Sequence, residues 1–305
     1  MINFTLKQLR YFEALADHGH FGRASEACAI SQPALSLQIK DLEAAVGQPL
    51  FERGARQVYL TSFGQEFAQR AGVILRGAQD LGDWTRAAQD GLMGRLRIGV
   101  IPTIAPYLLP RFIAHLTKEH ADLDVHIRES QTDRLVQEVT DGKLDAAIVA
   151  LPISHPALQE TPLFTEELCL VRHAQDAGKP VPDAQAMAEM RVLLLEEGHC
   201  FRDQALSFCN LRPNDGLDGS SLSTLVQMVG AGMGITFIPQ MAVPVETPSV
   251  PVDVVQFAPP APIRTIGILW RNSQPNMVQM HSVADAVCAA AQSLGLGRSK
   301  PALRA

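Results

Sequence analysis

The sequence is informative first through what it lacks. No apolar run among its 305 residues is long enough to cross a bilayer. The segment from Met1 to Phe12 has no cleavable signal pattern, so we expect a cytoplasmic protein without a membrane partner. Bulk positive charge is also missing, because the formal net charge is -6, and this argues against binding nucleic acid through overall charge. No internal repeat or low-complexity segment is present.

Motifs of several enzyme and metal sites are missing as well. There is no Gly-x-Ser-x-Gly elbow and no phosphate-cradling loop. No Cys-x2-Cys pair is present, so a structural zinc site is not expected, and we expect no metal and no cofactor. The five cysteines do not make a disulfide scaffold in a reducing compartment, and they leave room for a redox role. The content of 47% hydrophobic and 19% charged residues fits a globular protein of two or three domains.

The first sixty residues show the periodicity of short packed helices. Ser31-Gln-Pro starts the third of them, with a cap residue and a proline in the first turn. Two helices joined by a short turn, the second opened in this way, indicate a helix-turn-helix. The segment 48–60 predicts a short β-wing. Residues 1–62 contain six Lys or Arg and six Asp or Glu, so DNA binding must depend on local placement of charge.

The third helix has one apolar face and one unusual outer face. The apolar face is formed by Leu35, Ile39, Leu42 and Val46. The outer face carries Pro33, Ala34, Leu37 and Lys40. In a major groove Ala34 and Leu37 could touch thymine methyl groups, while Gln38 and Lys40 could reach bases or phosphates. Candidate phosphate contacts are Ser31, Arg53 and Arg56. The alternative is a small helical bundle that binds no ligand.

A long helix is predicted for residues 62–90, and Ser62 and Gln65 have the spacing of a capping box. Apolar and small residues along it alternate four and three apart, as in a seam that pairs with another helix. The members of this seam are Phe67, Ala71, Ile74, Ala78, Leu81, Thr85 and Ala88. The alternative is a helix that packs on its own domain.

From Arg95 onward the pattern changes to strand-helix-strand-helix-strand, which predicts a parallel sheet with right-handed crossovers. Thr103 follows the first strand and Thr132 the second, at the edge where open α/β sheets bind ligands. A second lobe is predicted to start near Leu168. It contains His199 and Cys200, which follow another apolar strand. Two facing lobes would direct these four residues towards one cleft, although each threonine alone could be a simple helix cap.

Cys200 and Cys209 lie nine residues apart in a segment that favours a helix after Phe201. A helix N-terminus, His199 and Arg202 would all favour the reactive thiolate of Cys200. Nine helical steps span roughly 13 Å, whereas a disulfide needs Cα atoms about 4.4 to 6.8 Å apart. Oxidation of Cys200 to a sulfenic acid and condensation with Cys209 would therefore require remodelling, which makes the pair a candidate switch. The other three cysteines, Cys28, Cys169 and Cys288, fit buried small hydrophobic residues.

These motifs resemble those of LysR-type transcriptional regulators and, within them, the hydrogen-peroxide sensors. The N-terminal motifs are Leu9-Arg-Tyr-Phe, Phe21-Gly-Arg-Ala-Ser, Ser31-Gln-Pro-Ala-Leu-Ser-Leu-Gln-Ile, Leu50-Phe-Glu-Arg and Leu60-Thr-Ser-Phe-Gly. The motifs shared with the peroxide sensors are Gly99-Val-Ile-Pro-Thr, Glu129-Ser-Gln-Thr, Gly198-His-Cys-Phe-Arg-Asp with Cys209, and Arg264-Thr-Ile-Gly. The resemblance covers nearly the whole chain.

The resemblance implies roles for particular residues. Cys200 falls on the peroxidatic cysteine and Cys209 on the resolving cysteine. Residues expected to position peroxide are Thr103, Thr132, His199, Arg202, Asp203 and Arg264. Residues expected to contact DNA are Ser31, Gln32, Pro33, Ala34, Ser36, Leu37, Gln38, Lys40, Arg53 and Arg56.

The resemblance also implies an architecture and partners. We expect an α/β protein with an N-terminal all-α winged helix-turn-helix domain at 1–61, a long linker helix for dimerisation at 62–91 and a regulatory domain at 92–305. The regulatory domain would be two-lobed, like periplasmic binding proteins, with lobe I at about 92–167 and 267–297 and lobe II at about 168–266. Expected partners are double-stranded promoter DNA, RNA polymerase, hydrogen peroxide, thioredoxin or glutaredoxin as reductant, and further copies of the chain in a homodimer or homotetramer.

Three functions compete. The leading hypothesis is a transcription regulator, an activator of antioxidant genes, that senses peroxide through a reversible Cys200–Cys209 disulfide and is not an enzyme. The second is a LysR-type regulator that binds a small organic effector and has inert cysteines. The third is a thiol peroxidase with an attached DNA-binding domain, which a DNA-reading head makes the least favoured.

Overall fold

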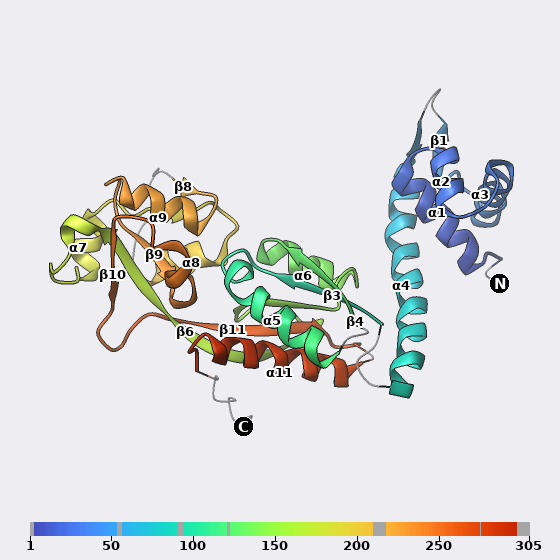
Figure 1. Cartoon of the computed structure of the whole chain (residues 1–305). Helices are drawn as coiled ribbons and strands as arrows, with labels where there is room; N and C mark the ends of the chain where they lie inside the picture. The colour runs from blue at the N-terminus through green and yellow to red at the C-terminus, as the bar shows by residue number, and fades with distance from the viewer. Residues whose placement is uncertain are drawn as a thin grey trace. The chain divides into compact units, whose positions relative to one another are not determined.

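The computed structural model describes residues 3–53, 57–90, 94–120, 123–209, 218–274 and 276–297. The chain forms two compact units, residues 1–85 and 86–305 (Figure 1). In the part of the chain that is described, no helix combines the length and the apolar character needed to span a bilayer.

The first unit contains the three predicted helices and the predicted wing. Its elements are α1 (Leu6–His18), α2 (Phe21–Ala27), α3 (Gln32–Val46), β1 (Phe51–Arg53) and β2 (Val58–Leu60). A capping box between Thr5 and Gln8 starts α1. The Ser31 side chain accepts a hydrogen bond from the Ala34 amide and caps α3 as predicted. The core is apolar, with Phe12 packed edge-on against Phe67 of the following helix.

The antiparallel pair β1 and β2 forms the wing, in the register Phe51 opposite Leu60. Glu43 of α3 accepts hydrogen bonds from the amides of Leu50 and Phe51, at 2.8 and 3.2 Å, and so fixes the start of the wing against α3. Both contacts span only a few residues of sequence, so the link between α3 and the wing is local.

The long helix α4 (Ser62–Asp90) has the predicted bounds. Its cap is one residue earlier than predicted, because the Thr61 hydroxyl, and not that of Ser62, accepts the amide hydrogen of Gly64 at 2.8 Å. Ala71 is buried in the first unit, whereas Ile74 and Leu81 are 47% and 62% exposed. Phe67 and Ala71 thus pack on their own unit, whereas Ile74 and Leu81 are exposed on this chain; the side chains of Thr85 and Ala88 lie outside the described residues.

Lobe I of the second unit is the predicted α/β structure. Its elements are β3 (Gly94–Val100), α5 (Ala105–Glu119), β4 (Leu123–Glu129), α6 (Thr132–Thr140), β5 (Ala146–Leu151) and α11 (Met277–Ser293). Strand β3 is parallel to both β4 and β5, as predicted. Helices α5 and α11 lie side by side (Figure 1), and α6 packs on β5.

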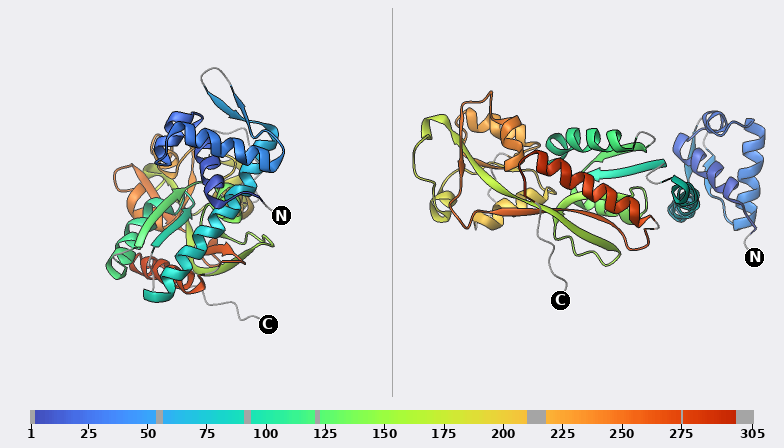
Figure 2. Two further views of the ribbon diagram at one scale, coloured as in Figure 1. Left: turned by 90° about the vertical axis from the view of Figure 1, so that its right-hand side faces the viewer. Right: turned by 60° about the horizontal axis from the view of Figure 1, so that its bottom comes forward.

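Two long strands, β6 (Leu158–His173) and β11 (Ile263–Arg271), carry the chain between the lobes (Figures 1 and 2). They pair antiparallel with each other up to Glu167, and from Leu168 onward β6 pairs with lobe II strands instead. The sheet order is β10-β6-β11-β5-β3-β4, where β10 is Val252–Gln256, and β9 (Thr236–Pro239) also pairs with β6. Continuous strands therefore join the lobes where the sequence pattern showed only a change of region.

Lobe II is built from shorter pieces. Its elements are η1 (Ala174–Asp176), α7 (Ala184–Glu189), β7 (Leu194–Leu195), α8 (Cys200–Cys209), β8 (Asp218–Gly219), α9 (Leu222–Gly230), β9 (Thr236–Pro239), η2 (Gln240–Ala242), α10 (Val243–Glu246) and β10 (Val252–Gln256). Strands β7 and β8 are parallel, and β7 leads directly into the turn before α8. Strand β10 was not predicted, because prolines on both sides hide its short apolar pattern.

Candidate functional site

Cys200 is the first residue of α8 and is half-buried. The preceding Gly198 has φ +90°, a left-handed conformation that glycine adopts without strain and that lets the chain turn from β7 into the helix. His199 is buried beside the cysteine. Burial lowers the pKa of His199, and the nearby Glu196 opposes this only in part. A pKa below the ordinary histidine value favours the neutral imidazole at neutral pH, and in this form His199 is available as a hydrogen-bonding group.

Arg264 of β11 is the centre of a buried polar network. It forms an ion pair with Glu166 of β6 at 2.7 Å, and both side chains are fully buried. Its guanidinium also donates to the Thr103 hydroxyl at 2.8 Å and to the Thr103 carbonyl at 3.0 Å. The same guanidinium lies 5.2 Å from the centre of the Phe201 ring. One cation thus fixes the end of β3, the crossing strands and the first turn of α8 relative to one another.

The two threonines are not helix caps. The Thr103 hydroxyl is engaged by Arg264, and α5 begins after Ile104 without a side-chain cap. Thr132 is the first residue of α6, and its buried hydroxyl has no hydrogen-bond partner among the described residues. A buried hydroxyl without a partner costs about 1 to 3 kcal/mol, so Thr132 is set to receive a further polar group.

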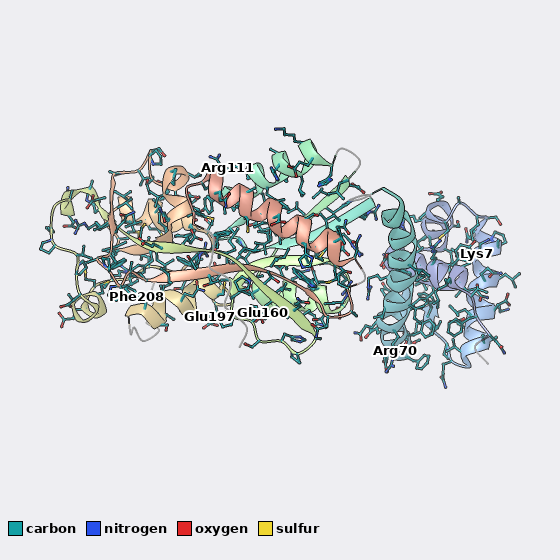
Figure 3. All side chains as sticks on the ribbon, turned by 90° about the horizontal axis from the view of Figure 1, so that it is seen from below. Lys7, Arg70, Arg111, Glu160, Glu197 and Phe208 are labelled. Carbon is teal, nitrogen blue, oxygen red and sulfur yellow. The ribbon has the colours of Figure 1, made fainter. Side chains whose placement is uncertain are left out.

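A third contact joins the lobes beside these residues. The side-chain amide of Gln131 donates to the Glu197 carbonyl at 3.3 Å. A Cβ added to Gly198 would lie only 2.8 Å from the Gln131 side-chain oxygen, so the two residues are in close contact. Figure 3 shows Glu197 between Phe208 of lobe II and Glu160 of lobe I.

Through these contacts the predicted residues Thr103, Thr132, His199 and Cys200, or their direct neighbours in sequence, meet at one junction between the lobes. Thr103 and Phe201 share the Arg264 guanidinium, and Phe201 is the neighbour of Cys200. Gln131, the neighbour of Thr132, touches the residues just before His199. We call this place the interlobe junction. It combines a half-buried thiol, an imidazole and a hydroxyl that lacks a hydrogen-bond partner among the described residues, a set suited to a small polar molecule that reacts with sulfur.

Two further predicted residues lie at its margin. Arg202 donates to the Leu195 carbonyl at 2.7 Å and pairs with Asp218 at 2.9 Å. Through these two contacts Arg202 fastens β7 and β8 to the first turn of α8. Asp203 lies exposed in the first turn of α8. Cys209 ends α8, and its side chain lies outside the described part of the structure.

The remaining cysteines differ from Cys200 in environment. Cys169 and Cys288 are buried, as predicted for small hydrophobic residues, whereas Cys28 is half-buried. Burial raises the pKa of Cys169 to about 11, and that of Cys28 is raised by the same cause. Because the thiolate is the nucleophile, these two thiols are poorly reactive at neutral pH.

The candidate DNA-reading face lies on α3. Leu35, Ile39 and Leu42 are buried, as predicted. The exposed predicted contacts are Ser31, Gln32, Pro33, Ala34, Leu37 and Lys40, with Ser36 and Gln38 partly exposed. Leu37 is 57% exposed, an uncommon position for leucine on a plain surface helix. Arg56 and the side chain of Arg53 lie outside the described residues.

Sequence reasoning gave no role to Gln131, Glu166 and Phe201. Glu166 carried a usable signal, because it interrupts the apolar run of β6 and a carboxylate buried in a strand needs a partner. Gln131 stood next to a candidate residue, but nothing in the sequence indicates that its side chain reaches the other lobe.

The class of protein follows from two family models. The model for "Bacterial regulatory helix-turn-helix protein, lysR family" matches residues 6–65. The model for "LysR substrate binding domain" matches residues 89–292. The chain therefore belongs to the LysR family of regulators.

Within this family it is similar to peroxide-responsive proteins. It is 39% identical over 298 residues, 95% of either chain, to a "Probable hydrogen peroxide-inducible genes activator" of Streptomyces viridosporus. A full-length OxyR variant from Pseudomonas aeruginosa superposes with a TM-score of 0.78 and 35% identity, covering 98% of this chain and 99% of that one. A hydrogen-peroxide-bound OxyR mutant from Corynebacterium glutamicum gives a TM-score of 0.67 and 33% identity, over 95% of this chain and 93% of that one.

Proposed function

We propose that this protein is a transcription activator that binds promoter DNA and senses hydrogen peroxide through Cys200. The observation that carries the proposal is the Thr132 hydroxyl, which is buried, lacks a partner among the described residues and lies at the interlobe junction. The similarity to regulators named for hydrogen peroxide supports the choice of ligand.

The chemistry proceeds in two balanced steps. The Cys200 thiolate attacks one peroxide oxygen, the O–O bond breaks, and hydroxide leaves to be protonated to water. The resulting sulfenic acid is attacked by the Cys209 thiolate, which forms the disulfide and releases a second hydroxide. Thr103, Thr132 and His199 orient the peroxide, while Arg264 holds Thr103 and the first turn of α8 in place.

The second step cannot occur in the helix as it stands. Cys200 and Cys209 open and close the single helix α8, so their Cα atoms are separated by roughly 13 Å, at about 1.5 Å per residue. A disulfide requires about 4.4 to 6.8 Å. Oxidation therefore selects a structure in which α8 is at least partly unwound. Closing this loop is worth roughly 3 kcal/mol in the chain-entropy model, enough to bias a two-state element about a hundredfold.

The output of the switch is DNA binding by the first unit. We assign DNA contacts to the exposed face of α3 and dimerisation to α4, whose Ile74 and Leu81 are exposed on the single chain. The functional divisions are residues 1–61, 62–91 and 92–305. Dimers or tetramers in the cytoplasm would read the promoter and engage RNA polymerase, and thioredoxin or glutaredoxin would reduce the disulfide. One oxidation suffices for each switching event, so no enzymatic turnover is needed.

The test compares Cys200→Ser with Cys28→Ser, a matched control because Cys28 is also half-buried. The Cys200→Ser variant is expected to bind DNA but to give no transcriptional response to micromolar peroxide, while Cys28→Ser responds like the wild type. Mass spectrometry after brief oxidation should find a Cys200–Cys209 crosslink in the control.

A normal peroxide response in Cys200→Ser would disprove the proposal. Absence of the crosslink would instead favour a regulator that binds a small organic effector. Sustained peroxide consumption with a thioredoxin system would favour a thiol peroxidase.

A further inference from the structure

The contact between Gln131 and the segment 197–198 has no part in the chemistry above, yet it joins two halves of the site. Gln131 directly precedes Thr132 in lobe I. Glu197 and Gly198 directly precede His199 and Cys200 in lobe II. The side-chain amide of Gln131 donates to the Glu197 carbonyl at 3.3 Å, between residues that are 66 positions apart.

The backbone of Gln131 is held in place by helix α6. Gln131 is the residue before α6, with extended backbone, and its carbonyl accepts the Leu135 amide at 3.1 Å. Helix α6 buries Leu135 and Val139 against lobe I, so its first turn cannot shift freely. The Gln131 side chain does not cap its own helix and reaches the other lobe instead.

The other side of the contact is shaped to receive it. Gly198 has φ +90°, and the nearest atoms to a Cβ built there would be three atoms of the Gln131 side chain, at 2.8 to 3.1 Å. Any larger residue would displace the glutamine as well as strain the backbone. The lack of a side chain at position 198 thus allows the amide to lie directly on the turn that leads into α8.

We propose that Gln131 is a positioning residue that sets the separation between the Thr132 hydroxyl and the Cys200 sulfur. The inference rests on the proposed function, because the separation matters only if a peroxide is held between them. Gln131 acts through the turn at 197–198 and not on the peroxide itself. A misplacement of about 1 Å between reacting groups can cost on the order of a hundredfold in rate, so loss of one such contact is sufficient to matter.

The experiment measures two rate constants in the Cys209→Ser background of the full-length protein, where the Cys200 sulfenic acid cannot condense with Cys209. One is the reaction of Cys200 with hydrogen peroxide, followed by dimedone trapping and mass spectrometry. The other is alkylation of Cys200 by iodoacetamide, which requires the thiolate but no bound peroxide. For Gln131→Ala we expect the peroxide rate constant to fall about tenfold or more, with iodoacetamide alkylation unchanged.

Gln137→Ala is the matched control, since Gln137 lies in α6, is exposed, and donates its side-chain amide to Asp141 of the same lobe at 2.8 Å. It should leave both rate constants at the wild-type values. Gly198→Ala should resemble Gln131→Ala, and the double variant should be no slower than Gly198→Ala alone, because both changes break the same contact.

The outcomes distinguish a failure of the positioning role from a failure of the proposed function. Equal losses with both reagents in Gln131→Ala would mean a general disturbance of the thiol and would overturn the positioning role, as would unchanged peroxide kinetics. If Cys200 of the wild-type chain fails to react with peroxide while iodoacetamide still alkylates it, the proposed function itself fails, and the positioning role falls with it.

Discussion

Two helices in this molecule begin with residues of functional interest, and they are held in place very differently. Helix α3 begins at its Ser31 cap, and its contact with the wing runs from Glu43 to Leu50, only 7 positions along the chain. Helix α8 begins at Cys200, and the contacts around its first turn come from Arg264 and Gln131. Arg264 also binds Thr103, which is 161 positions away in the sequence, and Gln131 binds Glu197, which is 66 positions away.

The difference shows how each site can change. The exposed face of α3 is separate from the apolar face that folds the unit, so substitutions there should alter DNA binding and leave stability unchanged. At the interlobe junction the residues that we propose to position the thiol also join the two lobes. Function and stability should therefore be inseparable around Cys200 and separable on α3.

The largest effect is expected from Arg264→Ala. It leaves the fully buried Glu166 without its cation, and breaking a buried ion pair costs about 3 to 5 kcal/mol. Urea denaturation followed by circular dichroism should show this loss in the regulatory unit. The control is Arg95→Ala, whose pairing with Asp124 at 3.3 Å is half-exposed and should contribute less than about 1 kcal/mol. If the two variants were equally stable, the buried Arg264 would contribute no more than an exposed arginine. The contrast between α8 and α3 would then fail.

A smaller and purely functional effect is expected from Lys40→Ala on α3. Loss of one phosphate contact should weaken binding to all DNA sequences and lower the salt dependence, the slope of log K against log salt, by about 1. Unfolding free energy and the rate of Cys200 oxidation should not change. Lys118→Ala in α5, also exposed, provides the control for loss of a lysine elsewhere. A drop in stability for Lys40→Ala would contradict the separation proposed for α3.

The smallest effect concerns pH and His199. Its pKa is lowered in the folded protein, so below about pH 6.5 the unfolded chain binds a proton that the folded chain does not. This contribution to stability is complete above that pH and is lost as the pH falls towards the lowered pKa, with a slope of at most about 1.4 kcal/mol per pH unit. His199→Gln should make the decline of unfolding free energy between about pH 6.5 and 5 shallower. An unchanged decline would show that His199 titrates alike in both states.

Local patterns predicted most of the individual elements. The bounds of α4 and β5 agree with the periodicity of the sequence, and the Ser31 cap was visible in three residues. Patterns failed where a neighbour far along the chain decides the outcome. The length of β6 comes from its pairing first with β11 and then with β9 and β10, and Thr61 was preferred to Ser62 as a cap by its place beside Leu50. The charge state of His199 and the pairing of Arg202 with Asp218 also depend on burial and on distant residues.

The sequence alone determined a DNA-reading head, a long helix and an α/β unit, because helix caps, apolar periodicity and turn residues act over a few neighbouring positions. It also predicted Cys200 at a helix start, where α8 begins. Only the tertiary structure decided that His199 is buried, that the Thr132 hydroxyl has no hydrogen-bond partner among the described residues, and that a glutamine of the other lobe lies on the turn before α8. Such surroundings arise from contacts between residues far apart in the chain, whose side-chain directions are set by packing and leave no periodic trace in the order of amino acids.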